Sequence, residues 1–208
     1  SLHDALPILR DVVTVQDVLA SPMISDPLRK LDCCLESDGG AAIVVSAAER
    51  AGDLRQPRVS ILGVAEGHPD SPGSITQRPD MTRLGIDKAA DRCFRMAGVE
   101  RSDIDVVQLY DCFTYVVICQ LEALGFCKKG EGGAFVEGGR LRLGGQLPTN
   151  THGGLLSQAH VWGLNHIVEL VRQLRGQAGD RQIPGNPKVG YSQLYGAPGT
   201  AGVSIISR

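Results

Sequence analysis

A short apolar segment in the middle of the chain runs directly into a polar corner and then into an apolar helix. Residues 104–109 have the apolar, β-branched character of a buried strand, Tyr110 and Asp111 form the corner, and a helix is expected from about Phe113 to Leu124. In α/β proteins the crevice beyond the carboxyl ends of strands collects functional side chains and a helix N-terminus. The segment therefore predicts an α/β fold with chemistry at this corner.

Other segments extend the α/β pattern on both sides of this corner. Apolar residues at spacings of three and four predict helices over residues 86–98 and 162–175. Alternating or β-branched runs predict strands over residues 58–66, 188–195 and 201–206. The glycine pair within residues 37–50 precedes an apolar run that predicts one more buried strand. The remaining long segments, residues 67–83 and the glycine-rich residues 130–145, are expected to be loops.

The composition argues against several classes of protein. The 208 residues include 21 Lys and Arg against 23 Asp and Glu, which leaves no basic excess to neutralise nucleic-acid phosphates. No apolar run reaches the roughly 18 residues that a membrane-spanning helix needs. The six cysteines are scattered and form no C-x-x-C pair, so neither a zinc site nor a disulfide framework is indicated. We therefore expect a cytoplasmic protein with no bound metal, no nucleic-acid partner and no membrane attachment.

Three corners combine polar side chains with glycines, at residues 110–113, 152–160 and 195–199. A cysteine ahead of a helix can have a lowered thiol pKa, phenols and imidazoles can move protons, and glycines let backbone N–H groups approach an oxyanion. Each corner alone is equally typical of an ordinary turn. The candidate catalytic residues are Tyr110, His160, Cys112, His152 and Tyr195. The candidate substrate-binding residues are Asp111, Gly153, Gly154, Gly196 and Gly199. His166 lies inside a predicted helix and is expected to be structural.

Taken in order, these segments resemble the thiolase superfamily. The resemblance is carried by S-D-G-G-A-A-I-V-V, D-I-D-V-V-Q-L-Y-D-C-F-T and N-T-H-G-G-L-L-S-Q-A-H-V-W-G, and it extends from about Ser21 to Arg208. It is closest to the lipid-transfer-protein (sterol carrier protein X) branch. The resemblance implies a thiolase-like fold in which residues 1–56 are a remnant of the N-terminal half and residues 57–208 form the C-terminal domain. Because the chain opens with Ser1 and lacks the family's nucleophilic cysteine, we expect an inactive fragment.

The resemblance also implies roles for the matched residues. His160 falls on the histidine of the family's Gly-His-Pro motif, which polarises the thioester oxygen. Residues 110–113 fall on a His-Asp-Cys-Phe turn, whose first residue faces the same oxygen and whose cysteine is placed for proton transfer. Here a tyrosine replaces that histidine, Ala and Val flank His160, and residues 194–196 lack the usual C-terminal cysteine. A phenol suits removal of a β-hydroxyl proton, as in retro-aldol cleavage, better than Claisen condensation.

We therefore expect an enzyme that makes or breaks a carbon–carbon bond α to a CoA thioester. The segments Y-D-C-F and H-G-G-L-L-S-Q-A-H resemble most those of the family's thiolase-like aldolases, which shorten steroid side-chain CoA esters. The favoured reaction is therefore retro-aldol cleavage of a β-hydroxyacyl-CoA such as a steroid side-chain CoA ester, with Tyr110 and His160 facing one carbonyl group. The resemblance implies no cofactor beyond the CoA of the substrate, a homodimer, and a small partner protein with an OB-fold and a zinc ribbon. Two alternatives remain. One is an acetyl-CoA acyltransferase that uses a cysteine from the missing half with Cys112 as acid or base, and the other is a non-catalytic lipid-binding or scaffold subunit.

Overall fold

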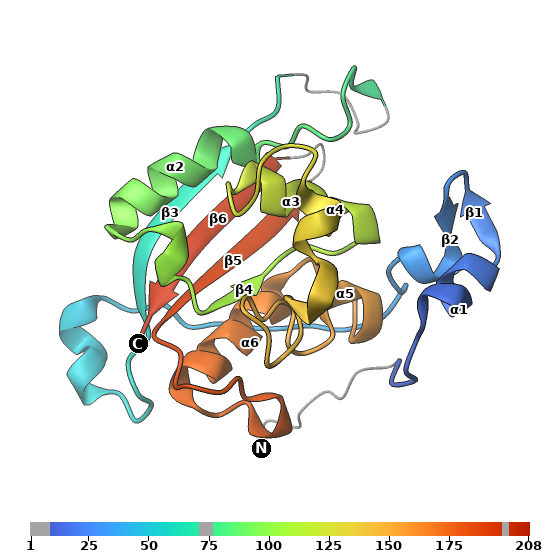
Figure 1. Cartoon of the computed structure of the whole chain (residues 1–208). Coiled ribbons are helices and arrows are strands. Elements are labelled where there is room, and N and C mark those ends of the chain that lie inside the picture. Colours follow the sequence, from blue (N-terminus) through green and yellow to red (C-terminus); the bar gives the residue numbers. More distant parts are fainter. Residues whose placement is uncertain (1–8, 71–76, 197–199) are drawn as a thin grey trace.

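A mixed four-stranded sheet forms the centre of the computed structural model, which describes residues 9–70, 77–196 and 200–208 (Figure 1). The strand order is β3–β6–β5–β4. The central strand β6 is antiparallel to both of its neighbours, whereas β5 and β4 run parallel. The strands are β3 (Ser60–Gly67), β4 (Val106–Gln108), β5 (Val189–Gly196) and β6 (Thr200–Ser207). All four lie where the sequence predicts strands.

Helices cover both faces of the sheet and give three layers (Figure 1). On one face lie α2 (Ile86–Ala97) and α3 (Thr114–Ala123), and Phe94 of α2 stacks on Tyr191 of β5 with ring centroids 6.1 Å apart. On the other face lies α6 (Leu164–Arg175), whose Leu170 and Leu174 are buried against the sheet. This α/β architecture confirms the predicted fold class, and the three long helices begin and end within two residues of the predicted positions.

The buried face of α6 is more polar than its sequence pattern suggests. Apolar periodicity predicts a face made of Ile167, Leu170, Val171 and Leu174, but Glu169 and Gln173 are also buried. The Glu169 carboxylate accepts hydrogen bonds from the Thr151 hydroxyl at 2.7 Å and from Gln173 Nε2 at 2.9 Å. It also forms an ion pair with Arg181 at 3.2 Å. Because the Glu169 carboxylate and the Gln173 amide both have partners, the helix can bury these two side chains without leaving the carboxylate charge unpaired.

The segment before β3 has little packing of its own. It contains α1 (Val15–Ala20) and a small hairpin of β1 (Met23–Ser25) and β2 (Leu28–Arg29), and none of the described residues from 9 to 59 is buried. The strand predicted after the glycine pair is wrong: residues 34–47 have no regular structure, and Val44 is 97% exposed. A strand needs a hydrogen-bonding neighbour, and the sheet ends at β3 and β4 without pairing to this segment.

The glycine-rich residues 130–145, predicted as a loop, contain a short helix that packs on the core. Phe135, Val136 and Leu141 lie against the α2–α3 layer, which supplies the cover that these apolar side chains require. In the part of the chain that the structure describes, no helix combines the length and apolar character needed to cross a bilayer. Among the residues that the structure describes, further short helices are η1 (Lys30–Asp32), η2 (Ala48–Asp53), η4 (Arg101–Asp103), α4 (Gly132–Phe135), η5 (Glu137–Gly139), α5 (Gly154–Ser157) and η6 (Gly179–Arg181).

Candidate active site

Tyr110 and His160 meet beyond the carboxyl end of β4. Tyr110 follows β4, and His160 lies in the turn between α5 and α6, 50 residues further along the chain. The Tyr110 hydroxyl and His160 Nε2 are 2.9 Å apart, and the two rings pack edge to face with centroids 5.8 Å apart. At this distance the phenol and the imidazole form a hydrogen bond, and the histidine tautomer decides which atom donates. The structure thus brings together the two residues that the sequence places in one pocket.

The segment before β3 contributes to both sides of this pair. The Ser37 hydroxyl accepts a 2.7 Å hydrogen bond from the backbone N–H of His160. Five residues earlier, the Asp32 carboxylate accepts a 2.7 Å hydrogen bond from the hydroxyl of Thr114, at the start of α3. Ser37 therefore belongs to the site although the sequence analysis did not select it, because nothing local indicates that this segment passes over the His160 turn.

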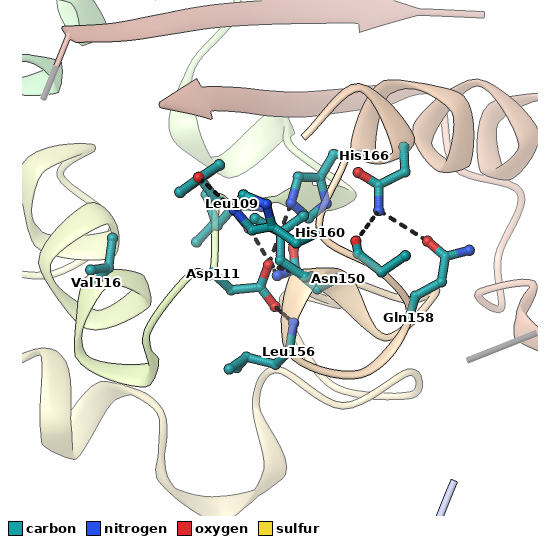
Figure 2. Close-up of polar contacts among 12 residues, drawn as sticks. Leu109, Asp111, Val116, Asn150, Leu156, Gln158, His160 and His166 are labelled. Atoms are coloured by element: carbon teal, nitrogen blue, oxygen red, sulfur yellow. Dashed lines mark hydrogen bonds and ion pairs between the residues drawn. The ribbon is translucent and has the colours of Figure 1, made fainter. Parts of the chain in front are cut away.

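Asp111 binds the backbone of α5. Its carboxylate is buried and accepts hydrogen bonds from the N–H groups of Leu155 at 2.8 Å and Leu156 at 3.4 Å (Figure 2). His166 Nε2 lies 3.4 Å from the same carboxylate. Since these groups already occupy both carboxylate oxygens, the geometry favours a positioning role for Asp111 over the substrate-binding role expected from sequence.

Gly154, which follows Gly153, makes this contact with Asp111 possible. Their φ angles are +102° and +63°, in the left-handed region that glycine adopts without strain. A Cβ atom on Gly154 would lie 2.0 Å from Asp111 Oδ2. Gly154 therefore leaves the space that the Asp111 carboxylate needs to reach the first turn of α5, and the substrate-binding roles expected of the two glycines stay predictions.

His152, expected to be catalytic, is enclosed by protein. It is 2% exposed, and its ring packs edge to face against His166 with centroids 5.0 Å apart. Burial, followed by electrostatic interactions with nearby His166, Arg181 and Arg172, lowers the pKa of His152 well below its usual 6.5. The ring is therefore neutral near pH 7 and closed to solvent, which favours a structural role. His166, expected to be structural, is buried as well.

The Cys112 thiol is held in its protonated form. Burial, reinforced by Cys34 and Asp111, raises the pKa of Cys112 to about 12. The lowered pKa expected from its place ahead of α3 is therefore wrong, because loss of hydration outweighs the helix dipole. The backbone carbonyl of Cys112 accepts a 2.9 Å hydrogen bond from Cys34 N–H, which further ties the segment before β3 to this corner.

The third predicted corner is described only in part. The backbones of Tyr195 and Gly196 end β5, where they pair with Ala201 and Thr200 of β6. The Tyr195 side chain and all of Gly199 lie outside the described residues, so their expected roles stay predictions. Among the residues that the structure describes, no three His, Cys, Asp or Glu side chains are arranged to hold a metal ion.

Two further residues hold the Tyr110 corner, and the sequence analysis did not select them. Gln120 of α3 contacts the backbone of Tyr110, and Asn150 contacts the backbone of Leu109 (Figure 2 shows Asn150). The available signal for Gln120 is its place as an uncharged polar residue in an otherwise apolar stretch of helix. Asn150 gives no comparable signal, because it stands in a polar loop where asparagine is common.

Residues 67–208 match the thiolase C-terminal domain-like family. The chain belongs to this family. It is 41% identical over 191 residues to the 17-hydroxy-3-oxo-4-pregnene-20-carboxyl-CoA lyase of Mycobacterium tuberculosis, a match that covers 90% of this chain and 48% of the relative. It is 40% identical over 203 residues to an acetyl-CoA acetyltransferase of Methanothermobacter thermautotrophicus, which covers 94% of this chain and 52% of the relative. The chain thus spans about half the length of these curated relatives.

One solved structure and one further curated relative are also similar to the chain. An Ltp2-ChsH2(DUF35) aldolase superimposes with a TM-score of 0.86 and 38% identity, covering 94% of this chain and 51% of that chain. A steroid side-chain-cleaving aldolase of Thermomonospora curvata is 43% identical over 172 residues, covering 79% of this chain and 43% of the relative. These similarities confirm the resemblance that the sequence motifs indicate.

Proposed function

We propose that the chain is the C-terminal domain of a thiolase-like aldolase that cleaves the bond between Cα and Cβ of a β-hydroxyacyl-CoA, such as a steroid side-chain CoA ester. Residues 1–56 are then the end of the N-terminal half. The proposal is carried by the 2.9 Å contact between the Tyr110 hydroxyl and His160 Nε2. It is supported by two relatives, at 41% and 43% identity, whose names describe a steroid CoA lyase and a side-chain-cleaving aldolase.

In the proposed reaction, Tyr110 and His160 handle the protons. The Tyr110 oxygen takes the proton of the substrate's β-hydroxyl group while its own phenolic proton passes to His160 Nε2. The freed electron pair forms a carbonyl at Cβ, the Cα–Cβ bond breaks, and its electron pair becomes the thioester enolate. The imidazolium stabilises the enolate oxygen through its charge. The enolate carbon then recovers the proton from the pair, so a carbonyl product and an acyl-CoA leave without any further co-reactant.

Acyl transfer is a second candidate, favoured by the 40% identity to an acetyl-CoA acetyltransferase. This reaction needs a nucleophilic cysteine from the N-terminal half and an acid or base on this chain. Cys112 fits the second role poorly, since a thiol with a pKa of about 12 does not release its proton near pH 7. The retro-aldol reaction asks nothing of this thiol, and we therefore favour it.

The proposed assembly is a homodimer with a small partner protein that carries an OB-fold and a zinc ribbon. It is supported by the name of the similar structure, an Ltp2-ChsH2(DUF35) aldolase, which has two components. Exposed apolar side chains before β3, such as Val12 at 93% and Val44 at 97%, agree with a segment that other parts of an assembly cover. A cytoplasmic location and the absence of a separate cofactor remain part of this proposal.

The experiment is product analysis with a full-length protein that carries this sequence. Mass spectrometry of reactions with a β-hydroxyacyl-CoA panel should detect a ketone or aldehyde that carries the rest of the chain, together with acetyl-CoA or an α-substituted homologue such as propionyl-CoA. Tyr110→Phe and His160→Ala should each lower kcat by about 10²-fold or more, as expected for loss of an acid–base group. Tyr191→Phe is the matched control, because it removes a buried phenolic hydroxyl that donates to Gln193 and not to His160.

Each alternative predicts a different outcome of this experiment. Release of a new acyl-CoA that depends on added free CoA would support acyl transfer. Folded Tyr110→Phe and His160→Ala variants that turn over acyl-CoA at the rate of the parent protein would support the scaffold subunit and refute the assigned site.

A further inference from the structure

The backbone that carries Tyr110 is held by two side-chain amides that take no part in the proposed proton transfers. We propose that Gln120 and Asn150 are positioning residues, which together fix the Tyr110 phenol against His160. This inference rests on the proposed function of the Tyr110–His160 pair and adds to it the means by which the pair keeps its geometry.

Gln120 satisfies both backbone polar groups of Tyr110. Its side chain is buried in α3, where Oε1 accepts a 3.1 Å hydrogen bond from Tyr110 N–H. Its Nε2 donates to the Tyr110 carbonyl at 2.6 Å and to the Val116 carbonyl at 3.0 Å. The Gln120 carboxamide therefore links Tyr110 to α3, the helix that follows it. Both its N–H donor and its carbonyl acceptor bind the backbone of Tyr110.

Asn150 does the same for the preceding residue. Its Oδ1 accepts a 2.7 Å hydrogen bond from Leu109 N–H, and its Nδ2 donates to the Leu109 carbonyl at 2.8 Å (Figure 2). Because β4 ends at Gln108, Leu109 and Tyr110 lie outside the named strands of the sheet. The two amides replace the missing strand ladder and hold two successive residues, from a helix on one side and a loop on the other.

We call the side-chain amides of Gln120 and Asn150 the clamp. The clamp matters for chemistry because the Tyr110 hydroxyl lies at the end of a long side chain, so a small rotation of the backbone displaces it by a large distance. Catalytic groups need to be held within roughly 0.5 Å and 10–20° of their productive geometry. A displacement of about 1 Å can lower a rate about 10²-fold. With Leu109 and Tyr110 both held at their N–H and C=O groups, the direction in which the Tyr110 side chain leaves the backbone is set before substrate binds, and the contact with His160 selects its rotamer.

Gln120→Glu tests the clamp because it removes the donor with little change of shape. The new carboxylate still accepts from Tyr110 N–H but faces the Tyr110 and Val116 carbonyl oxygens without a proton. Burial should raise the pKa of this carboxyl above its usual value of about 4.3, and the protonated form can donate again. Relative to the parent protein, kcat should therefore fall about 10- to 100-fold as pH rises through that pKa, with KM changed by less than about twofold.

Gln182→Glu is the matched control. Gln182 accepts a 3.1 Å hydrogen bond from Ala178 N–H and donates at 3.0 Å to the Gln173 carbonyl near the end of α6. The same substitution there disturbs an equivalent backbone clamp away from Tyr110. It should leave the pH dependence of kcat unchanged, which separates positioning of the phenol from a general loss of stability.

Asn150→Asp provides an independent second variant. It removes the donor to the Leu109 carbonyl, and aspartate tolerates the φ of +48° at this position. We expect the same fall of kcat at high pH with little change in KM. This variant keeps the proposal falsifiable if Gln120→Glu does not fold.

A readout without turnover separates this inference from the proposed function. The readout is the Cζ signal of Tyr110 in [¹³C]tyrosine-labelled full-length protein, assigned with Tyr110→Phe. In Gln120→Glu this signal should move away from its position in the parent protein as pH rises, whereas in Gln182→Glu it should match the parent protein at every pH. A parent protein that cleaves no β-hydroxyacyl-CoA refutes the proposed function, while this signal still tests the clamp. The parent pH profile of kcat and an unshifted Tyr110 signal in folded Gln120→Glu and Asn150→Asp would overturn the positioning role.

Discussion

Gly154→Ala should destabilise the protein much more than its change of size suggests. Gly154 has a φ of +63°, and a Cβ atom there would lie 2.0 Å from Asp111 Oδ2. The left-handed backbone alone costs an L-residue roughly 1–2 kcal/mol. Displacing the Asp111 carboxylate from the Leu155 and Leu156 N–H groups loses hydrogen bonds to a charged group worth about 1.5–3 kcal/mol each, of which the first is the shorter. Counting the left-handed backbone and only the shorter hydrogen bond, from Leu155 N–H, we expect a total loss of about 2.5–5 kcal/mol.

Gly98→Ala separates the two contributions. Gly98 ends α2 with a φ of +67°, nearly that of Gly154, but nothing lies within 4 Å of a Cβ atom there. Its substitution should cost only the backbone contribution of roughly 1–2 kcal/mol. Urea unfolding of both full-length variants and the parent protein measures the difference, and hydrogen exchange of the Leu155 amide shows whether Asp111 still binds it. Equal losses in the two variants, or an unchanged Leu155 exchange rate in Gly154→Ala, would refute the role assigned to Gly154.

Two further predictions follow from the pKa shifts. Because the pKa of Cys112 is raised to about 12, iodoacetamide near pH 8 should alkylate it at least about tenfold more slowly than a free cysteine with a pKa of about 8.5. Cys112→Ala should keep kcat within about threefold of the parent value. Rapid alkylation or a large loss of kcat would contradict this prediction. His152 binds a proton less readily folded than unfolded, so stability should fall once pH drops below the unfolded pKa of about 6.5 and should keep falling until pH reaches the lower folded pKa. His152→Phe should flatten this dependence in urea unfolding between pH 7.5 and 5, and an equally steep dependence would show that His152 is not its source.

The sequence predicts the pair at the centre of the site, Tyr110 and His160, but not the residues that hold this pair in place. Tyr110 and His160 stand in motifs whose order resembles a known family, so their meeting was foreseeable. Asp111 and Gly154 belong to the same motifs, yet only their contacts show that the glycine leaves room for the carboxylate to bind the backbone of α5. Residue type alone cannot tell a carboxylate that binds substrate from one that binds a helix, since both are acceptors with the same chemistry.

The local pattern of apolar residues determines the helices, the strands and the α/β class. A strand repeats every two residues and a helix about every 3.6, so the spacing of apolar side chains indicates which of the two backbones buries them on one face. This local pattern does not predict contacts between segments that are distant in the sequence. Ile43, Val44 and Val45 have strand-like sequence but no strand beside them, so they lie in an exposed extended segment. Ser37 on His160, the amides of Gln120 and Asn150 on the Tyr110 corner, and the buried thiol of Cys112 were decided by the tertiary structure. Hydrogen bonding, desolvation and steric exclusion act across space and depend on which surfaces the fold brings together.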